Sequence, residues 1–224
     1  KADIRDGKYI GGSIVFDGDV KIDANLGMIE FESIKARGYI HAGAGTGIKT
    51  SYGIKSGGGI EVGLGIKSGR AIAADWGIVA GESIEAGWEL VAGEYIEAGT
   101  FIKAEDGIEA GLGIKAGGYI ESGRDIIAGE YIKAGEYIKS GQEIIAREFI
   151  EAGKFIKTGE YVEAGCEIIA GKYIEAGWGI KAGAEIHAGT DISVKGRIFA
   201  GLMMWKQPNP EEMEIRCRRL KDGE

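Results

Sequence analysis

The sequence has little proline and little cysteine, and it lacks long apolar runs. Among 224 residues only two are proline, Pro208 and Pro210, and only two are cysteine, Cys166 and Cys217. Two cysteines so far apart provide neither a disulfide framework nor a metal-binding CxxC pair. No run approaches the roughly 18 apolar residues of a membrane span. No signal sequence is visible, although the chain begins at Lys1, and these features together favour the cytoplasm.

Glycine, in contrast, is abundant. The chain has 41 glycines, about 18% against a usual share of roughly 7%. Collagen would need glycine at every third position together with abundant proline. A disordered chain would have low hydrophobicity, whereas 44% of these residues are apolar. The net charge of -8 argues against a general nucleic-acid binder. We therefore expect a folded protein with no nucleic-acid partner.

A repeat of six residues runs through most of the chain. From Ile48 to Met204 every sixth residue is a large aliphatic one, a small residue follows two positions later, and glycine usually comes next. In residues 95–100 (YIEAGT), strand alternation places isoleucine and alanine on one face, and tyrosine and glutamate on the other. Glycine then turns a corner, where it can adopt a positive φ. The repeat predicts an all-β fold: a single-domain parallel β-solenoid with an Ile/Ala core.

The outward charges predict how many repeats form one coil. Residues stacked on neighbouring coils lie about 4.8 Å apart, so opposite charges stabilise the stack and like charges weaken it. Between residues 97 and 181, a spacing of 12 gives two opposite and five like-charged pairs, whereas a spacing of 18 gives six opposite and two like-charged pairs. The chain is therefore predicted to be triangular, with about 18 residues in each of about eleven coils.

Breaks in the repeat predict the organisation of the chain. Before residue 41 the rhythm has another frame, formed by Ile4, Ile10, Phe16, Ile22, Met28, Ile34 and Ile40. We predict N-terminal solenoid coils over 1–40, a short insertion over 41–47 and a regular solenoid over 48–205. Residues 206–224 lose the rhythm, and we predict that they form a C-terminal cap across the last coil.

The repeat resembles that of the bactofilins, polymer-forming bacterial proteins with a right-handed triangular solenoid. In Ile132-Lys133-Ala134-Gly135 the small residue follows the aliphatic one, whereas in the left-handed hexapeptide family it precedes the aliphatic one by two positions. The resemblance is one of repeat style and extends over nearly the whole chain. It implies end-to-end self-assembly without a nucleotide, and it favours a right-handed coil.

Candidate catalytic residues are sparse. Hexapeptide acyltransferases share the period, but they rely on a histidine base beside a long projecting loop, and this chain has only His41 and His187. A γ-type carbonic anhydrase would need three histidine ligands. Asp125 and Glu143 stack at a spacing of 18 as a weak cation site at most, and Cys166 has no base nearby in the repeat. We predict no enzyme, no cofactor and no metal, with an acyltransferase-like enzyme as a remote alternative.

The outward aromatic residues form the candidate interface. At a spacing of 18 they form an aromatic column of Phe101, Tyr119, Tyr137, Phe155 and Tyr173. Tyr95, Tyr131 and Phe149 lie on the adjacent column, which Gly113 interrupts. Contiguous exposed aromatics often mark interfaces, although stacked rings also stabilise neighbouring strands.

These surfaces predict the function. We predict a rigid structural scaffold that acts through the aromatic strip or by end-to-end stacking, because the ends of a solenoid expose unpaired strand edges. A glycan- or protein-binding spike is the alternative. The expected partners are a second copy of the chain, another protein or a polysaccharide.

Overall fold

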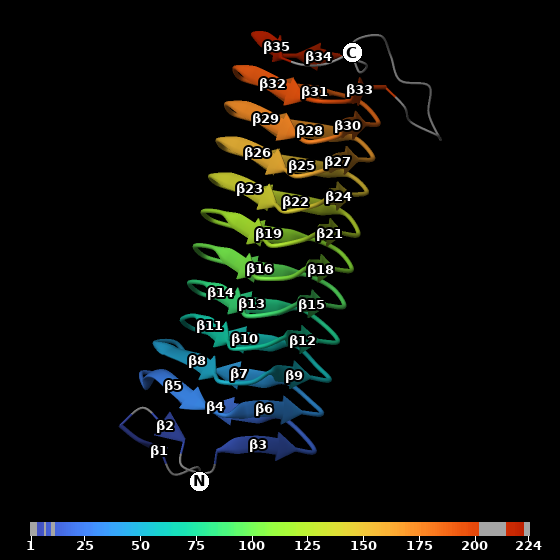
Figure 1. Ribbon diagram of the computed structural model, residues 1–224. Helices are drawn as coiled ribbons and strands as arrows, with labels where there is room; N and C mark the ends of the chain where they lie inside the picture. Colours follow the sequence, from blue (N-terminus) through green and yellow to red (C-terminus); the bar gives the residue numbers. More distant parts are fainter. Residues whose placement is uncertain (1–3, 7, 10–11, 202–213, 222–224) are drawn as a thin grey trace. The chain divides into compact units, whose positions relative to one another are not determined.

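The computed structural model describes residues 4–6, 8–9, 12–201 and 214–221 (Figure 1). It divides into two compact units, Lys1–Gly111 (unit 1) and Leu112–Glu224 (unit 2). Both units are parallel β-solenoids built from three sheets, as predicted, with about 18 residues per turn and about 10 turns in all. The described residues include no helix, and so none long and apolar enough to cross a membrane.

Unit 1 contains three sheets, labelled A1, B1 and C1. Sheet A1 consists of β1 (Ile4–Arg5), β2 (Lys8–Tyr9), β5 (Gly27–Phe31), β8 (Thr46–Thr50), β11 (Ile66–Ser68), β14 (Ile84–Ala86) and β17 (Ile102–Ala104). Sheet B1 consists of β3 (Ser13–Phe16), β6 (Ser33–Ala36), β9 (Ile54–Ser56), β12 (Ile72–Ala74), β15 (Leu90–Ala92) and β18 (Ile108–Ala110). Sheet C1 consists of β4 (Val20–Ile22), β7 (Ile40–Ala42), β10 (Ile60–Val62), β13 (Ile78–Ala80) and β16 (Ile96–Ala98).

Unit 2 repeats this arrangement in sheets A2, B2 and C2. Sheet A2 consists of β20 (Ile120–Ser122), β23 (Tyr137–Ser140), β26 (Phe155–Thr158), β29 (Tyr173–Ala176), β32 (Asp191–Val194) and β35 (Arg219–Lys221). Sheet B2 consists of β21 (Ile126–Ala128), β24 (Ile144–Ala146), β27 (Tyr161–Ala164), β30 (Gly179–Ala182) and β33 (Arg197–Phe199). Sheet C2 consists of β19 (Ile114–Ala116), β22 (Tyr131–Ala134), β25 (Phe149–Ala152), β28 (Glu167–Ala170), β31 (Ile186–Ala188) and β34 (Ile215–Arg216).

The core of each unit consists of stacked aliphatic side chains. In sheet A2, Ile138 pairs with Ile120 on one side and Ile156 on the other, and all three are fully buried. Serine or threonine takes the small inward position in some repeats. The hydroxyl of Ser140, for example, donates a hydrogen bond to the carbonyl of Glu143 at 2.9 Å. Every buried side-chain nitrogen or oxygen among the described residues has a hydrogen-bond partner, so the narrow core tolerates these hydroxyls.

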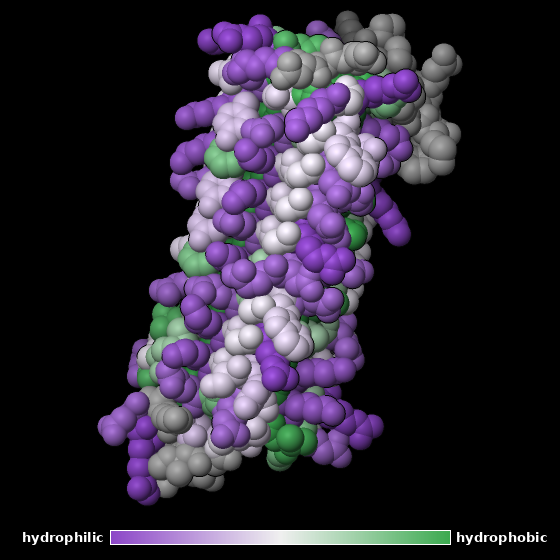
Figure 2. Space-filling view, in the orientation of Figure 1, coloured by the Kyte–Doolittle hydropathy of each residue, from purple (hydrophilic) through white to green (hydrophobic). Residues whose placement is uncertain are grey.

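The outward charges form the predicted ladders wherever both partners lie in unit 2. Lysine and glutamate 18 residues apart approach closely in the pairs Lys139–Glu121 (3.2 Å), Lys133–Glu151 (2.6 Å), Lys157–Glu175 (2.9 Å) and Lys181–Glu163 (2.6 Å). Hydrophilic side chains project over most of the visible surface (Figure 2). These exposed pairs contribute little stability each, about 0–1 kcal/mol, but they favour the 18-residue register over a 12-residue one.

The corner glycines serve a different purpose from the one predicted. Between residues 48 and 200 no glycine has a positive φ. Instead, a Cβ at Gly141 would lie 2.0 Å from the carbonyl oxygen of Gly123, and a Cβ at Gly177 would lie 1.8 Å from that of Gly159. Glycine is therefore favoured because successive coils approach one another closely at the corners. The requirement is not absolute, since Arg147 occupies one such corner.

The frame predicted for residues 1–40 is correct at Ile34 and Ile40, which are buried in the core, and wrong in the coils before them. Ile10 lies outside the described residues. Phe16 and Met28, expected in the core, are 54% and 42% exposed. Ile14 in β3 and Ile29 in β5 take the positions that pair with the inward isoleucines of the next coil. Ile4 lies in β1, which pairs antiparallel with β2 rather than forming a parallel coil strand. Several neighbouring positions in these coils are apolar, so the six-residue period can be started at more than one of them. The sequence alone favoured the wrong starting position.

The described part of the predicted cap continues the sheets. β34 pairs parallel with β31, and β35 pairs parallel with β32, so these strands extend sheets C2 and A2 rather than lying across the last coil. Pro208, Pro210 and the predicted frame position Met204 lie outside the described residues.

Candidate functional site

Four members of the predicted aromatic column form a continuous stack in unit 2. Tyr119, Tyr137, Phe155 and Tyr173 lie at the same position of successive coils, and neighbouring ring centroids are 4.8, 4.8 and 4.9 Å apart. Their ring planes differ by only 2–4°. The spacing of parallel strands thus holds the rings face to face. The fifth member, Phe101, is half-buried beside β17 in unit 1.

The stack presents ring edges rather than ring faces to its surroundings, because each inner ring has a neighbour on both faces. Burial, followed by the nearby Glu121 carboxylate and Tyr119, raises the pKa of Tyr137 above its ordinary value. The phenol therefore stays protonated at neutral pH and serves as a hydrogen-bond donor, including to Glu121. Ladder ion pairs such as Lys157–Glu175 flank the stack, so its border is charged.

The adjacent group of aromatics is built differently. Tyr131 and Phe149 stack in sheet C2 with centroids 5.5 Å apart. A Cβ at Gly113 would lie 2.4–2.8 Å from three neighbouring atoms of the Tyr131 ring. Three adjacent atoms at such similar distances mean that the face of the ring, not its edge, covers the glycine. Gly113 therefore does not simply interrupt the aromatic column, because it provides the space that the Tyr131 ring occupies. Tyr95 covers Gly77 in the same way in unit 1.

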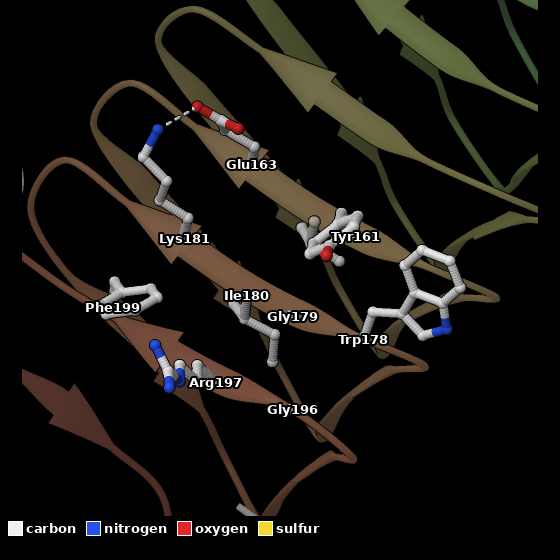
Figure 3. A pocket seen from close by; sticks show the side chains of 10 residues that line it. Tyr161, Glu163, Trp178, Gly179, Ile180, Lys181, Gly196, Arg197 and Phe199 are labelled. Atoms are coloured by element: carbon white, nitrogen blue, oxygen red, sulfur yellow. Dashed lines mark hydrogen bonds and ion pairs between the residues drawn. The ribbon is translucent and has the colours of Figure 1, made fainter. Parts of the chain in front are cut away.

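A groove in unit 2 has tryptophan at a corner, which sequence reasoning missed (Figure 3). Trp178 is 58% exposed and meets Tyr161 edge-to-face, with centroids 5.7 Å apart at 89°. The Tyr161 ring lies over Gly179, with the nearest ring carbon 2.8 Å from where a Cβ would be. Arg197 and Phe199 line the groove on the neighbouring strand, and the groove has a volume of about 370 Å³. The signal in the sequence is a tyrosine 18 residues from a glycine in the same column.

A second corner group lies in unit 1. The guanidinium of Arg70 lies between two rings, with its Cζ atom 4.9 Å from the centroid of Tyr52 and 5.1 Å from that of Trp88. All three residues are exposed and follow one another in the column at the corner between sheets A1 and B1. The sequence pattern does not predict this cation–π sandwich, because its three residues lie at corners, outside the positions that flank each isoleucine.

The titratable candidates remain scattered. The side chain of His41 is exposed on β7, with Nδ1 3.5 Å from the carboxylate of Glu61, and His187 lies on β31. The carboxylate of Asp125 accepts the backbone N–H of Glu143 at 3.1 Å. Burial, and then two nearby carboxylates, raise the pKa of the Cys166 thiol, which disfavours a reactive thiolate. Among the described ranges no group of three or more His, Cys, Asp or Glu residues is arranged to hold a metal ion.

The comparisons with known proteins supply no relative. No protein-family model, no curated protein and no solved structure matches this chain. The resemblance to bactofilins therefore stays a prediction, as does the handedness of the coil.

Proposed function

We propose that this chain is a rigid, non-enzymatic scaffold that associates with other molecules, first of all with copies of itself, through the stacked aromatic column. The observation that carries the proposal is the unbroken stack from Tyr119 to Tyr173, held at 4.8–4.9 Å on the same edge of successive coils. The bactofilin-like order of the repeat supports the self-association of copies, because that resemblance implies end-to-end self-assembly, but it does not bear on the column as the contact surface.

Rigidity follows from the construction of unit 2. Between β19 and β32, successive coils are joined by parallel backbone ladders in all three sheets and by stacked, fully buried aliphatic side chains. A long, regular strip of apolar ring edges bordered by Lys–Glu pairs has the composition of an interface, with an apolar centre and a charged rim. Ring edges and phenol hydroxyls suit contact with a protein surface, whereas a sugar would need free ring faces.

The experiment is to measure the mass and shape of the full chain in solution. Size-exclusion chromatography with light scattering, together with negative-stain microscopy of the same fractions, compares the unmodified chain with Tyr137→Ala/Phe155→Ala. The matched control is Ile127→Ala/Ile145→Ala, which removes a stacked aliphatic pair from sheet B2. Circular dichroism checks that each variant folds.

We expect oligomers that the aromatic variant loses and the control keeps. A chain that stays monomeric across the concentration range would contradict self-assembly, and oligomers that survive in the aromatic variant would show that the column is not the surface through which the copies associate.

A glycan-binding spike is the second candidate, favoured by the groove of Figure 3. There Tyr161 and Trp178 are 43% and 58% exposed, and Arg197 adds a cation that pairs with none of the described residues. Exposed aromatic rings beside an arginine suit a sugar that carries a carboxylate. Titration with an oligouronate, followed by tryptophan fluorescence, tests this role. Trp178→Ala should abolish the response, and Trp88→Ala should not.

A further inference from the structure

A groove on sheet C1 of unit 1 is built on glycine between two tyrosines. Tyr39, Gly59, Gly77 and Tyr95 are the residues immediately before four successive strands of this sheet, β7, β10, β13 and β16. The ring of Tyr39 lies over Gly59, 3.2 Å from where its Cβ would be, and the ring of Tyr95 lies over Gly77 at 2.6 Å. The two tyrosines therefore lean towards one another and form an aromatic floor. The groove has a volume of about 520 Å³.

Trp76 forms one wall of this groove at the corner between sheets B1 and C1. Its ring meets Tyr39 with centroids 5.4 Å apart and planes at 80°. An edge-to-face pair leaves two ring faces at right angles, which together enclose a corner. The three rings are only partly buried within the unit: the exposed fractions are 43% for Tyr39, 52% for Trp76 and 40% for Tyr95. Much of each ring can therefore contact a ligand.

The charge of the groove is negative. Glu61 and Glu94 line it, and none of the described lysines or arginines does. Glu94 makes no ion pair with any residue in the described ranges, and the only ionic contact of Glu61 there is with His41 at 3.5 Å. Ring faces also carry partial negative charge, so rings and carboxylates attract the same type of ligand, a cation with apolar substituents.

Unit 1 already shows that this combination of rings holds a cation. At a different corner of the same unit, the Arg70 guanidinium occupies the space between Tyr52 and Trp88. In the groove, the glycines leave room for the rings of Tyr39 and Tyr95 to lie over them, and no lysine or arginine of the described residues lines the groove. The rings of the groove can therefore bind a cation from another molecule, because no described residue places its own cation there.

We propose that this groove binds an organic cation of the quaternary or N-methylated ammonium class, with Trp76, Tyr39 and Tyr95 as its rings and Glu61 and Glu94 as its counter-charges. The ligand is either a free small molecule or a methylated lysine of a partner, because both present the same cationic group. The proposal does not rest on the scaffold role, which uses residues of unit 2.

The test titrates the full chain with choline and with tetramethylammonium, followed by tryptophan fluorescence and by calorimetry. The control ligand is the neutral analogue of choline, in which a tert-butyl group replaces the trimethylammonium group. We expect saturable binding of both cations and at least about fivefold weaker binding of the neutral analogue. Trp76→Ala should weaken cation binding by about fivefold or more, and Glu94→Gln should weaken it by a few-fold. Trp88→Ala, which removes an equally exposed corner tryptophan, should leave it unchanged.

Two peptides, one with trimethyllysine and one with unmodified lysine, distinguish the sources of the cation. Tighter binding of the methylated peptide than of choline indicates a protein partner, and equal or weaker binding indicates a small molecule. The proposal is overturned if the neutral analogue binds as well as choline, if Trp76→Ala and Glu94→Gln both leave binding unchanged, or if neither cation binds. Loss of the oligomers described above would leave this result untouched, so the two proposals fail independently.

Discussion

The close approach of coils at the corners predicts that Gly141→Ala destabilises unit 2 although its backbone has an ordinary φ. The new Cβ would lie 2.0 Å from the carbonyl oxygen of Gly123, so the two coils must separate by about 1 Å. That movement stretches the hydrogen bond from the Gly141 N–H to the Ser122 carbonyl, already 3.2 Å long. Losing one or two backbone hydrogen bonds at about 1 kcal/mol each, plus strain of about 1–2 kcal/mol, outweighs the gain of about 0.4–1 kcal/mol from a stiffer unfolded chain. The net expectation is a loss of about 2 kcal/mol.

Urea unfolding measures the loss of unfolding free energy. Because long repeat arrays can depart from two-state behaviour, hydrogen exchange at the affected corner is also needed, and it shows where stability is lost. The matched control is Arg147→Ala. Residue 147 occupies the equivalent position of the next repeat, at the corner between sheets B2 and C2. It is exposed and already carries a Cβ, so its truncation should change the free energy of unfolding by no more than about 0.5 kcal/mol. If Gly141→Ala is as stable as the unmodified chain, close approach is not the reason for glycine at the corners.

Three further predictions follow from the same structure. Ile138→Ala removes a fully buried side chain stacked between two others and should lower the free energy of unfolding by about 3 kcal/mol in urea titration; a loss below about 1 kcal/mol would contradict the packed core. Burial and nearby carboxylates raise the pKa of Tyr137 above 10.0, so its neutral phenol contributes stability that is fully present below that pH and is lost as pH rises through the higher folded value. Tyr137→Phe should remove this contribution, and phenolate absorbance should show one fewer late-titrating tyrosine. Arg70→Lys should cost about 0.5–1 kcal/mol and shift the emission of Trp88, since an ammonium cannot stack flat between that ring and Tyr52; unchanged stability and emission would refute the sandwich.

The fold followed from the sequence because one rule acts at almost every repeat. A buried Ile, an outward residue and a small inward residue can only alternate along a strand, and the stacking of opposite charges selects 18 residues per turn. Lys133 lies 2.6 Å from Glu151, and Lys181 lies 2.6 Å from Glu163, as that spacing requires. The same register produced the ring stack around Tyr137. These features depend on periodicity alone, which the sequence displays directly.

The predictions were wrong where the six-residue period could be placed in two ways. They were also wrong where the distance between neighbouring coils, rather than the sequence pattern, determines which residue fits. In β3 the inward place falls to Ile14 and leaves Phe16 exposed, because both positions are apolar and only the pairing with β6 distinguishes them. The sequence predicted that the corner glycines are needed for a positive φ. Their actual role depends on how close a Cβ would come to the carbonyl oxygen of the preceding coil, and only the three-dimensional structure shows that distance. The tryptophans at positions 76, 88 and 178 occupy corners, outside the positions that alternation describes.

The setting of each outward aromatic ring is decided by the residue one coil away rather than by its own identity. Tyr137 has rings on both neighbouring coils, so its faces are covered and its edge points outward. Tyr95 has Gly77 on the preceding coil, lies flat over it and remains 40% exposed. An edge-presenting ring suits protein contact, and a face-presenting ring suits a cation or a sugar. In a solenoid of this kind, the function of a surface is therefore encoded by pairs of residues about 18 positions apart, and a glycine in such a pair is as informative as the tyrosine.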